Sequence, residues 1–282
     1  MDNLRGSLFM TVSMLLFAVE DMLVKLAAAA LPLGEVMLAE GLVGALAFAA
    51  LAAAKGQAAL PRALFSRGIA VRSVFEVTGR LFYAFAIALT PLSAASAILQ
   101  ATPLVVVAGA AAVLGETVGA RRWAAVFAGF AGVMVVLRPG LSGFDALSLL
   151  AVVGMAGFAG RDLATRAAPP HLTSAQLGVA GFVMLALAGA IALATQTPAL
   201  PPAGLWPVLV ALPVFGTAGY QALTLAMRTG EVAAVTPFRY TRLIFGTALG
   251  VAVFHERPDA FTLLGGALIV ASGLYALHAA RR

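Results

Sequence analysis

Four residues between positions 67 and 90 have the types and the spacing to bind a charged solute. Arg72, Glu76, Arg80 and Tyr83 follow one another at intervals of four, four and three residues, so they share one face of a helix. An ionised side chain at the centre of a bilayer costs about 2.5–3.5 kcal/mol, so this face cannot meet lipid. The stripe predicts either a cavity wall in which Glu76 and Arg80 bind a zwitterion, or a self-neutralising ladder that fixes helix packing, with Arg72 extending to the membrane surface.

A second cationic segment lies near the end of the chain. Arg239 and Arg242 are three residues apart, with Tyr240 between them, which suits the binding of a carboxylate and the stacking of a side chain. Pro237 cannot donate a backbone hydrogen bond and favours a kink, so it is a candidate hinge. The alternative is that both arginines pair with acids of the first half of the chain, those near residue 20.

Neutral polar residues mark two further positions. Ser96 and Gln100 are one helical turn apart on one face, and Pro103 shortly after them is a second candidate hinge. Tyr220 follows two prolines of the predicted eighth span, at a depth where a substrate can pass. We predict that these side chains bind substrate; the alternative for buried amides and hydroxyls is that they only join helices.

The acids Glu20, Asp21 and Asp162 occupy corresponding places in the first and sixth predicted spans. A proton-coupled carrier needs a buried carboxyl group, and these three are the candidates; the alternative is a structural pair that holds the two halves together. Acids and bases at membrane depth are balanced in number, which predicts mutual pairing around a polar interior. The acids are Glu20, Asp21, Glu40, Glu76 and Asp162, and the bases are Arg72, Arg80, Arg161, Arg239 and Arg242.

The composition shows what must position these residues. The chain has 282 residues, of which 62% are hydrophobic and 11% are charged, and its mean hydropathy is +1.00. A soluble domain carries about 25% charged residues. The apolar runs are continuous and reach about 20 residues, the length that spans a bilayer as a helix, whereas strands of a membrane barrel would alternate. We therefore predict an all-α integral membrane protein with ten transmembrane helices.

Prolines, glycines and charges punctuate the apolar runs. The predicted spans are 5–28, 33–54, 67–90, 93–115, 121–138, 144–167, 173–195, 204–228, 231–254 and 259–279. Alternate loops differ in basic residues, because one set holds Arg5, Lys55, Arg62, Arg67, Arg121, Arg122, Arg166, Arg228, Arg281 and Arg282, and the other holds Lys25, Arg138 and Arg257. Since cytoplasmic loops carry the excess of Lys and Arg, both termini are expected in the cytoplasm.

The chain also repeats itself. Phe17 to Asp21 with Lys25 recurs 141 residues later as Phe158 to Asp162 with Arg166, and Glu116 recurs 140 residues later as Glu256. Each half holds five spans, an odd number, so the second half must insert upside down relative to the first. The prediction is two inverted five-helix repeats, residues 1–140 and 141–282, in one membrane domain.

Several motifs along the chain resemble those of a known protein family. The residues 88–99, followed by Thr102-Pro103-Leu104, Leu114-Gly115-Glu116, residues 129–132 and residues 137–140, resemble the drug/metabolite transporter superfamily of EamA type in order and spacing. The second half supplies residues 240–243, 254–256 and 264–266. The sequence departs from the family where Leu243 stands for a frequent proline and His255 for a usual glycine. The resemblance covers essentially the whole chain.

The resemblance implies a ten-helix exporter of amino acids and related metabolites, close to the bacterial aromatic amino-acid exporters, with Gln100 and the fourth span at a central cavity. We expect broad specificity, alternating access, and a cavity bounded by spans 1, 3, 4, 6, 8 and 9. A drug or nucleotide-sugar carrier of the same fold is the alternative. A drug carrier would need an apolar cavity with one acid, whereas this sequence has interior residues of both charge signs, which favours amino acids.

Other classes are less compatible with the sequence. There is no H-E-x-x-H, G-x-S-x-G or Walker motif, so we expect no enzyme activity. The absence of cysteine excludes disulfides and thiolate metal sites, and we expect no cofactor or metal. The net charge of +6 fits cytoplasmic loops rather than nucleic-acid binding. The expected partners are the lipid bilayer and a small-molecule substrate, in a monomer of the bacterial inner membrane.

Overall fold

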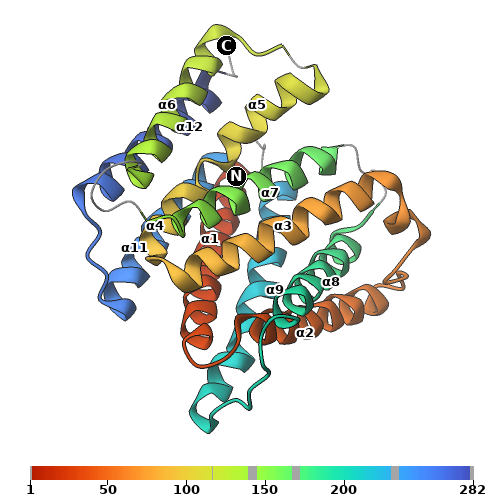
Figure 1. Ribbon diagram of the computed structural model, residues 1–282. Coiled ribbons are helices and arrows are strands. Elements are labelled where there is room, and N and C mark those ends of the chain that lie inside the picture. Colours follow the sequence, from red (N-terminus) through yellow and green to blue (C-terminus); the bar gives the residue numbers. More distant parts are fainter. Residues whose placement is uncertain (1, 116, 139–144, 167–171, 230–234, 280–282) are drawn as a thin grey trace.

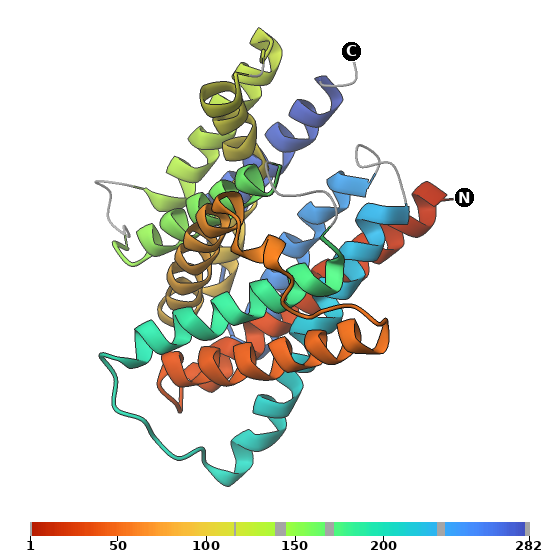
Figure 2. The ribbon, with the colours of Figure 1, turned by 90° about the vertical axis from the view of Figure 1, so that its right-hand side faces the viewer.

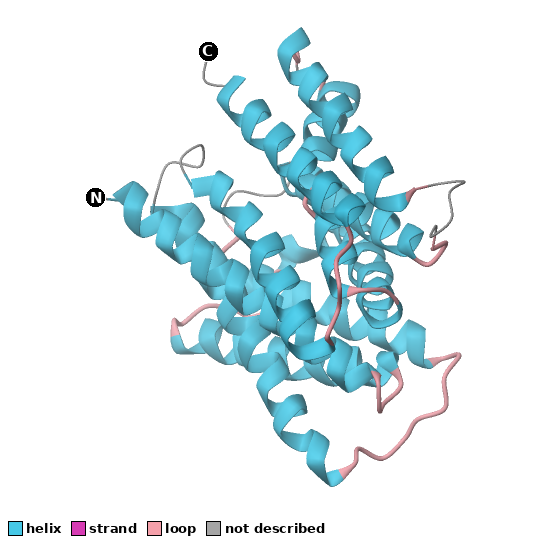
Figure 3. Ribbon diagram, turned by 90° about the vertical axis from the view of Figure 1, so that its left-hand side faces the viewer, coloured by secondary structure: helices cyan, strands magenta, loops and turns pink. Residues whose placement is uncertain are grey.

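The computed structural model describes residues 2–115, 117–138, 145–166, 172–229 and 235–279, and every regular element in these ranges is helical (Figure 3). The first half contains α1 (Asp2–Ala28), α2 (Leu33–Ala54), α3 (Arg67–Leu89), α4 (Leu92–Leu99), α5 (Thr102–Leu114) and α6 (Ala120–Leu137). The second half contains α7 (Ser148–Arg166), α8 (Ser174–Leu193), α9 (Trp206–Thr229), α11 (Thr241–Phe254) and α12 (Ala260–Ala279). Short 3₁₀ helices are η1 (Arg62–Phe65), η2 (Ala203–Leu205) and η3 (Thr236–Tyr240).

These helices confirm the predicted ten-span, all-α fold with its two repeats. The fourth span is divided into α4 and α5, and the ninth begins as η3 and continues as α11 (Figure 1). The predicted boundary between the repeats, at residue 140, lies outside the described residues, as do Glu116 and parts of several connecting loops.

Packing between the two halves follows the inverted repeat. The most extensive pairs are α2 with α8, α3 with α7, α1 with α9 and α6 with α12, and each joins one helix of the first half to one of the second. Exchanging every helix for its counterpart converts α3–α7 into α9–α1 and leaves α2–α8 and α6–α12 unchanged. This is the contact pattern of a pseudo-two-fold axis through the middle of the bundle. The start of α1 and the end of α12 lie toward one end of the molecule (Figure 2).

Small residues let α2 and α8 approach closely. A side chain built on Gly34 or Gly41 of α2 would collide with the backbone of α8 at Leu193 or Ala186, and one built on Gly189 of α8 would collide with the backbone at Leu38. The two helices lie side by side in both ribbon views. Backbone contact of this kind leaves no room for repacking, so this pair forms a rigid unit of the fold.

The helices differ in how apolar they are. Five segments are long and apolar enough to span a membrane by themselves: Asp2–Ala28, Leu33–Ala54, Leu92–Val113, Ser174–Leu193 and Ala203–Met227. By contrast, α3 and α7 carry Arg72, Glu76, Arg80, Arg161 and Asp162. These two helices pack against each other, so their charged faces turn inward while α3 exposes Val74 on the other side.

Two glycines of α8 provide a matched test of this packing. Gly189→Ala should destabilise the protein, because overpacking against the backbone of α2 costs about 1–3 kcal/mol. Gly181→Ala meets nothing within 4 Å and should be neutral or stabilising, since alanine has a helix propensity about 1 kcal/mol better than glycine. Thermal unfolding in detergent measures both, and equal melting temperatures for the two variants would contradict the proposed close contact.

Candidate functional site

A buried carboxylate on α3 holds three arginines. Glu76 is 1% exposed, and its oxygens lie 3.2 Å from Arg72 Nη2, 3.2 Å from Arg80 Nε and 3.4 Å from Arg161 Nη1. The first two contacts are the predicted ladder along one helix face, and the third ties α3 to α7 of the other half. The expectation that Arg72 extends to the membrane surface is wrong: its side chain is buried, and its Nε donates to Thr165 Oγ1 at 3.0 Å.

A second ion pair joins α1 to α11. Arg242 Nη2 donates to both carboxylate oxygens of Asp21, at 2.9 and 2.7 Å, and the Tyr83 hydroxyl donates to Oδ2 at 3.2 Å. The guanidinium also lies over the rings of Phe17 and Tyr83, 5.2 and 5.7 Å from their centroids. Arg242 and Asp21 therefore form a buried ion pair between the two halves of the chain, while the proton-coupling role of Asp21 stays a prediction.

The third charged group is more open. Asp162 Oδ1 accepts from Arg161 Nη2 at 2.7 Å, while its Oδ2 lies 4.0 Å from Arg239 Nη2. The Arg239 and Asp162 side chains are 31% and 25% exposed, the highest values among the ion pairs of this interior. No other ion pair of Arg239 is found in the described part of the chain, so among the described cations that line the cavity Arg239 is the most weakly paired.

Two helix breaks, one in each half, meet beside Arg239. The α-helical fourth span is interrupted between α4 and α5 at Gln100 and Ala101, and Pro103 occupies the first turn of α5. The Gln100 side chain then donates from Nε2 to the carbonyl oxygen of Arg239 at 3.0 Å, in the η3 segment that contains Pro237. The two residues are 139 positions apart, close to the repeat offset, so the contact lies near the pseudo-two-fold axis.

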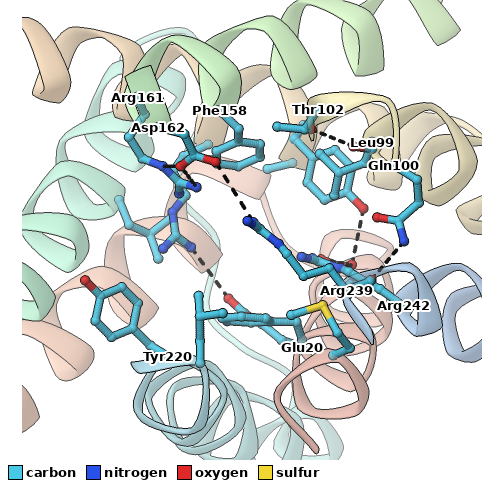
Figure 4. Close-up of a pocket in the computed structure, with 18 of the residues that line it drawn as sticks. Glu20, Leu99, Gln100, Thr102, Phe158, Arg161, Asp162, Tyr220, Arg239 and Arg242 are labelled. Atoms are coloured by element: carbon cyan, nitrogen blue, oxygen red, sulfur yellow. Dashed lines mark hydrogen bonds and ion pairs between the residues drawn. The ribbon is translucent and has the colours of Figure 1, made fainter. Parts of the chain in front are cut away.

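These groups surround a cavity of about 440 Å³, within the usual range of about 300–1,000 Å³ for small-molecule sites. In Figure 4 the side chains of Asp162, Arg239, Gln100, Glu20 and Tyr220 lie around a common open space. Aromatic rings supply much of the apolar wall. They are Phe17, Tyr83, Phe158, Tyr220 and Tyr240.

The structure brings together most of the predicted site residues. The predicted residues that line the cavity are Glu20, Asp21, Arg80, Tyr83, Gln100, Pro103, Asp162, Tyr220, Arg239 and Tyr240. Glu76, Ser96 and Pro237 are not part of the lining: Glu76 is enclosed by its arginines, and Ser96 packs against Gly246 of α11. The predicted roles of all these residues in binding, proton coupling or hinging remain predictions.

Sequence reasoning missed part of the site. The cavity also takes residues from α2 and α8, including Met37, Glu40 and Leu185, whereas we expected only spans 1, 3, 4, 6, 8 and 9. Glu40 could have indicated that α2 lines the cavity, since an acid inside an otherwise apolar helix has to face the interior. Phe158, by contrast, is a phenylalanine in an apolar run with no such signal.

One end of the cavity is closed by a polar cluster, which we call the end clamp: Lys25, Thr90, Leu92, Ser93 and Glu256. The Glu256 carboxylate accepts from the backbone nitrogens of Leu92 and Ser93 at 2.6 and 3.0 Å, which caps the start of α4. Lys25 Nζ lies 3.6 Å from Glu256 Oε1 and donates to the carbonyl oxygen of Thr90. The clamp thus joins the ends of α1, α3 and α11 to the start of α4.

The cavity extends toward the opposite end of the bundle, where α1 begins. Its lining there includes Thr165 at the end of α7, Ser174 at the start of α8 and Met227 near the end of α9. On the clamp side its last members are Val24 and Ile87, both buried. The described conformation is therefore closed at the clamp and extends toward the end that contains the N-terminus.

Comparison with known proteins gives a family match over nearly the whole chain. The model of the EamA-like transporter family matches twice, over residues 4–138 and 144–277. The pseudopaline exporter CntI of Pseudomonas aeruginosa is 29% identical over 274 residues, covering 94% of this chain and 93% of the relative. A riboflavin transporter of Rhizobium johnstonii is 28% identical over 208 residues, covering 73% and 68%.

More distant similarities agree with this match. An S-adenosylmethionine uptake transporter of Rickettsia bellii is 23% identical over 221 residues, covering 75% of this chain and 72% of the relative. One solved crystal structure with 20% identity has a TM-score of 0.63 and covers 98% of both chains. At this identity the structural similarity concerns the fold alone.

The end clamp can be tested by labelling, because the chain has no cysteine of its own. In an Ile87→Cys background, Glu256→Gln should raise the rate of maleimide labelling about tenfold, since hydrogen bonds to a charged group are worth about 1.5–3 kcal/mol. The matched control is Asp259→Asn, three residues away, which pairs with Arg138 at 2.6 Å outside the cavity. Equal labelling rates in the Glu256→Gln protein and the control would show that the clamp does not hold this end closed.

Proposed function

This chain belongs to the EamA-like transporter family and is a membrane transporter of small molecules, and from this premise we propose that it exports amino acids and related small metabolites by alternating access. Broad specificity, with aromatic amino acids included, is part of the proposal. The observation that carries it is the pair Arg239 and Asp162, whose opposite charges face one cavity 4.0 Å apart (Figure 4).

The chemistry of the pair suits a zwitterion. Arg239 presents a guanidinium that binds a carboxylate with two parallel hydrogen bonds, and Asp162 Oδ2 can accept from an ammonium group. Because each of these side chains is partly exposed and the two are only loosely paired, a substrate can insert between them without breaking a tight buried ion pair. The other arginines already have carboxylates at 2.7–3.7 Å.

The aromatic lining extends the proposal to the side chain of the substrate. Phe158 packs edge-on against Tyr83, with ring centroids 6.0 Å apart, and Tyr220 lies on the other side of the cavity. Rings prefer offset and edge-to-face arrangements with other rings, so this wall favours aromatic and apolar side chains without demanding one shape. The relatives' named cargoes, pseudopaline, riboflavin and S-adenosylmethionine, support a small metabolite as the substrate class.

Direction and orientation complete the proposal. We infer that the protein lies in a bacterial inner membrane with the end that contains the N-terminus facing the cytoplasm, because one set of loops holds ten basic residues and the other three. The described conformation then receives substrate from the cytoplasm, and the end clamp faces the outside. Release requires the clamp to open while the cytoplasmic end closes, with Pro103 and Pro237 as hinges between the two conformations.

Counterflow in proteoliposomes tests this function. Vesicles preloaded with one unlabelled amino acid should accumulate labelled phenylalanine or threonine, and Arg239→Ala should weaken this uptake about 10–100-fold, the effect of losing a charged hydrogen bond of about 1.5–3 kcal/mol. Arg138→Ala, which removes an arginine bonded outside the cavity, is the control. If no amino acid drives or competes with uptake by folded protein, the drug or nucleotide-sugar carrier becomes the better interpretation.

The two ends of the substrate can be assigned separately. With 3-phenylpropionate and phenethylamine as competitors, Arg239→Ala should weaken competition by the carboxylate and leave the amine unaffected, whereas Asp162→Asn should do the reverse. Each loss should be about tenfold or more, as expected for one charge-assisted hydrogen bond. A uniform loss for both competitors in either variant would mean that the residue maintains the shape of the cavity and does not contact the substrate.

A further inference from the structure

One acid of the cavity is left without a cation. Glu40 lies in the middle of α2, is 3% exposed and contributes to the cavity lining. Its Oε1 atom is buried and has no hydrogen-bond partner, and no Lys, Arg or His nitrogen lies within 4.0 Å of its carboxyl group in the part of the chain that the structure describes. The other four acids at membrane depth each have at least one arginine.

The group that faces Glu40 is a second carboxyl group. A Cβ atom built on Gly216 of α9 would lie 2.9 Å from Glu40 Oε1 and 3.2 Å from Glu20 Oε1, so both oxygens point at the same small space. Glu20 is itself buried and reaches Arg80 Nη1 only at 3.7 Å. Neither carboxylate can donate a hydrogen bond to the other unless one of them carries a proton.

The side chains around Glu40 and Glu20 do not supply a positive charge for both carboxyl groups. From α1, Asp21 also faces the pair, but it is bound by Arg242. From α3, Arg80 is shared between Glu20 and Glu76. From α9 come Gly216 and, one turn further, the Tyr220 phenol, while α8 contains no charged residue.

A metal cation does not fit this place. The described residues contain no group of three or more His, Cys, Asp or Glu side chains that could hold a metal ion. In addition, the Arg80 guanidinium already lies beside Glu20. Two carboxyl groups at close range usually share one proton, because both cannot ionise without strong repulsion.

We propose that Glu40 and Glu20 form a proton-binding site, in which Glu40 carries the proton, and that this site couples transport to a proton gradient. A proton from the water of the cavity adds to the Glu40 carboxylate, and the resulting O–H donates to Glu20. The proton leaves Glu40 for water when the cavity opens on the other side of the membrane, so no other reactant is needed. The coupling rests on the function proposed above, whereas the proton site itself does not.

Infrared spectroscopy tests the site directly and needs no substrate. The purified wild-type protein should show the C=O stretching band of a protonated carboxyl group at neutral pH, and this band should disappear as the pH is raised. Glu40→Gln should remove the band, and the glutamine can still donate to Glu20, which favours folding. Glu35→Gln, on the same helix but bonded to the backbone of Ala199 outside the cavity, should keep it. A wild-type spectrum without the band, or a Glu40→Gln spectrum that retains it, would overturn the site.

Transport tests the coupling. A pH gradient should be imposed on proteoliposomes in each direction in separate samples, and uptake of labelled phenylalanine compared with counterflow by the same preparation. For one of the two directions of the pH gradient, the ratio of uptake to counterflow should rise in the wild type and in Glu35→Gln. Glu40→Gln should lower the response by at least about tenfold, because an amide cannot take up and release a proton as a carboxyl group does. Glu40→Asp, which keeps a carboxyl group, should recover part of it.

The outcomes separate the two proposals. If the wild type moves no amino acid but the infrared band is present and depends on Glu40, the proposed substrate is wrong and the proton site stands. If counterflow occurs but the pH gradient acts equally on the wild type and on Glu40→Gln, the substrate proposal stands and the coupling through Glu40 is wrong.

Discussion

Ionised side chains at membrane depth must be neutralised inside the protein, and the remainder of this structure depends on that requirement. Lipid offers no compensation for a buried charge, and breaking a buried pair is strongly destabilising. The arginines of α3, α7 and α11 therefore turn inward and bind carboxylates, often across the two halves: Glu76 to Arg161, and Asp21 to Arg242. The charged interior both holds the repeats together and creates the polar cavity between them.

Two kinds of contact between the halves have different mechanical consequences. The α2–α8 pair meets backbone to backbone at glycines, and a contact without side chains to repack allows little sliding. At the end clamp, by contrast, one carboxylate and one lysine connect four chain segments. The proposed opening at this end would break these few hydrogen bonds and leave the glycine-packed α2–α8 contact intact.

The cavity combines two types of charged group that differ in how fully they are paired. Arg239 and Asp162 are partly exposed and loosely paired, as a binding site for a charged solute requires. Glu20 and Glu40 are buried and face each other, an arrangement that suits a proton better than a larger cation. Glu20, Glu40, Arg239 and Asp162 line one space, so in each conformation substrate and proton would exchange with the same side of the membrane, the condition for coupling export of one to entry of the other.

The sequence by itself determined the helices, their inverted repetition and which residues are turned away from lipid. Length and hydropathy limit an apolar run to a spanning helix, and the arginines and acids within such runs have to face inward. The charged stripe on α3 and the candidate hinge at Pro103 followed from spacing and from proline chemistry. The tertiary structure alone decided which charge pairs with which. Arg72 binds Glu76 and Thr165 instead of reaching the surface, Arg239 faces Asp162, and Glu40 meets Glu20 because α1, α2 and α9 converge at Gly216. Such pairings depend on how each helix is rotated and how the helices cross. Rotation and crossing are set by the packing of small residues between segments that are distant in sequence, so no local sequence pattern predicts them.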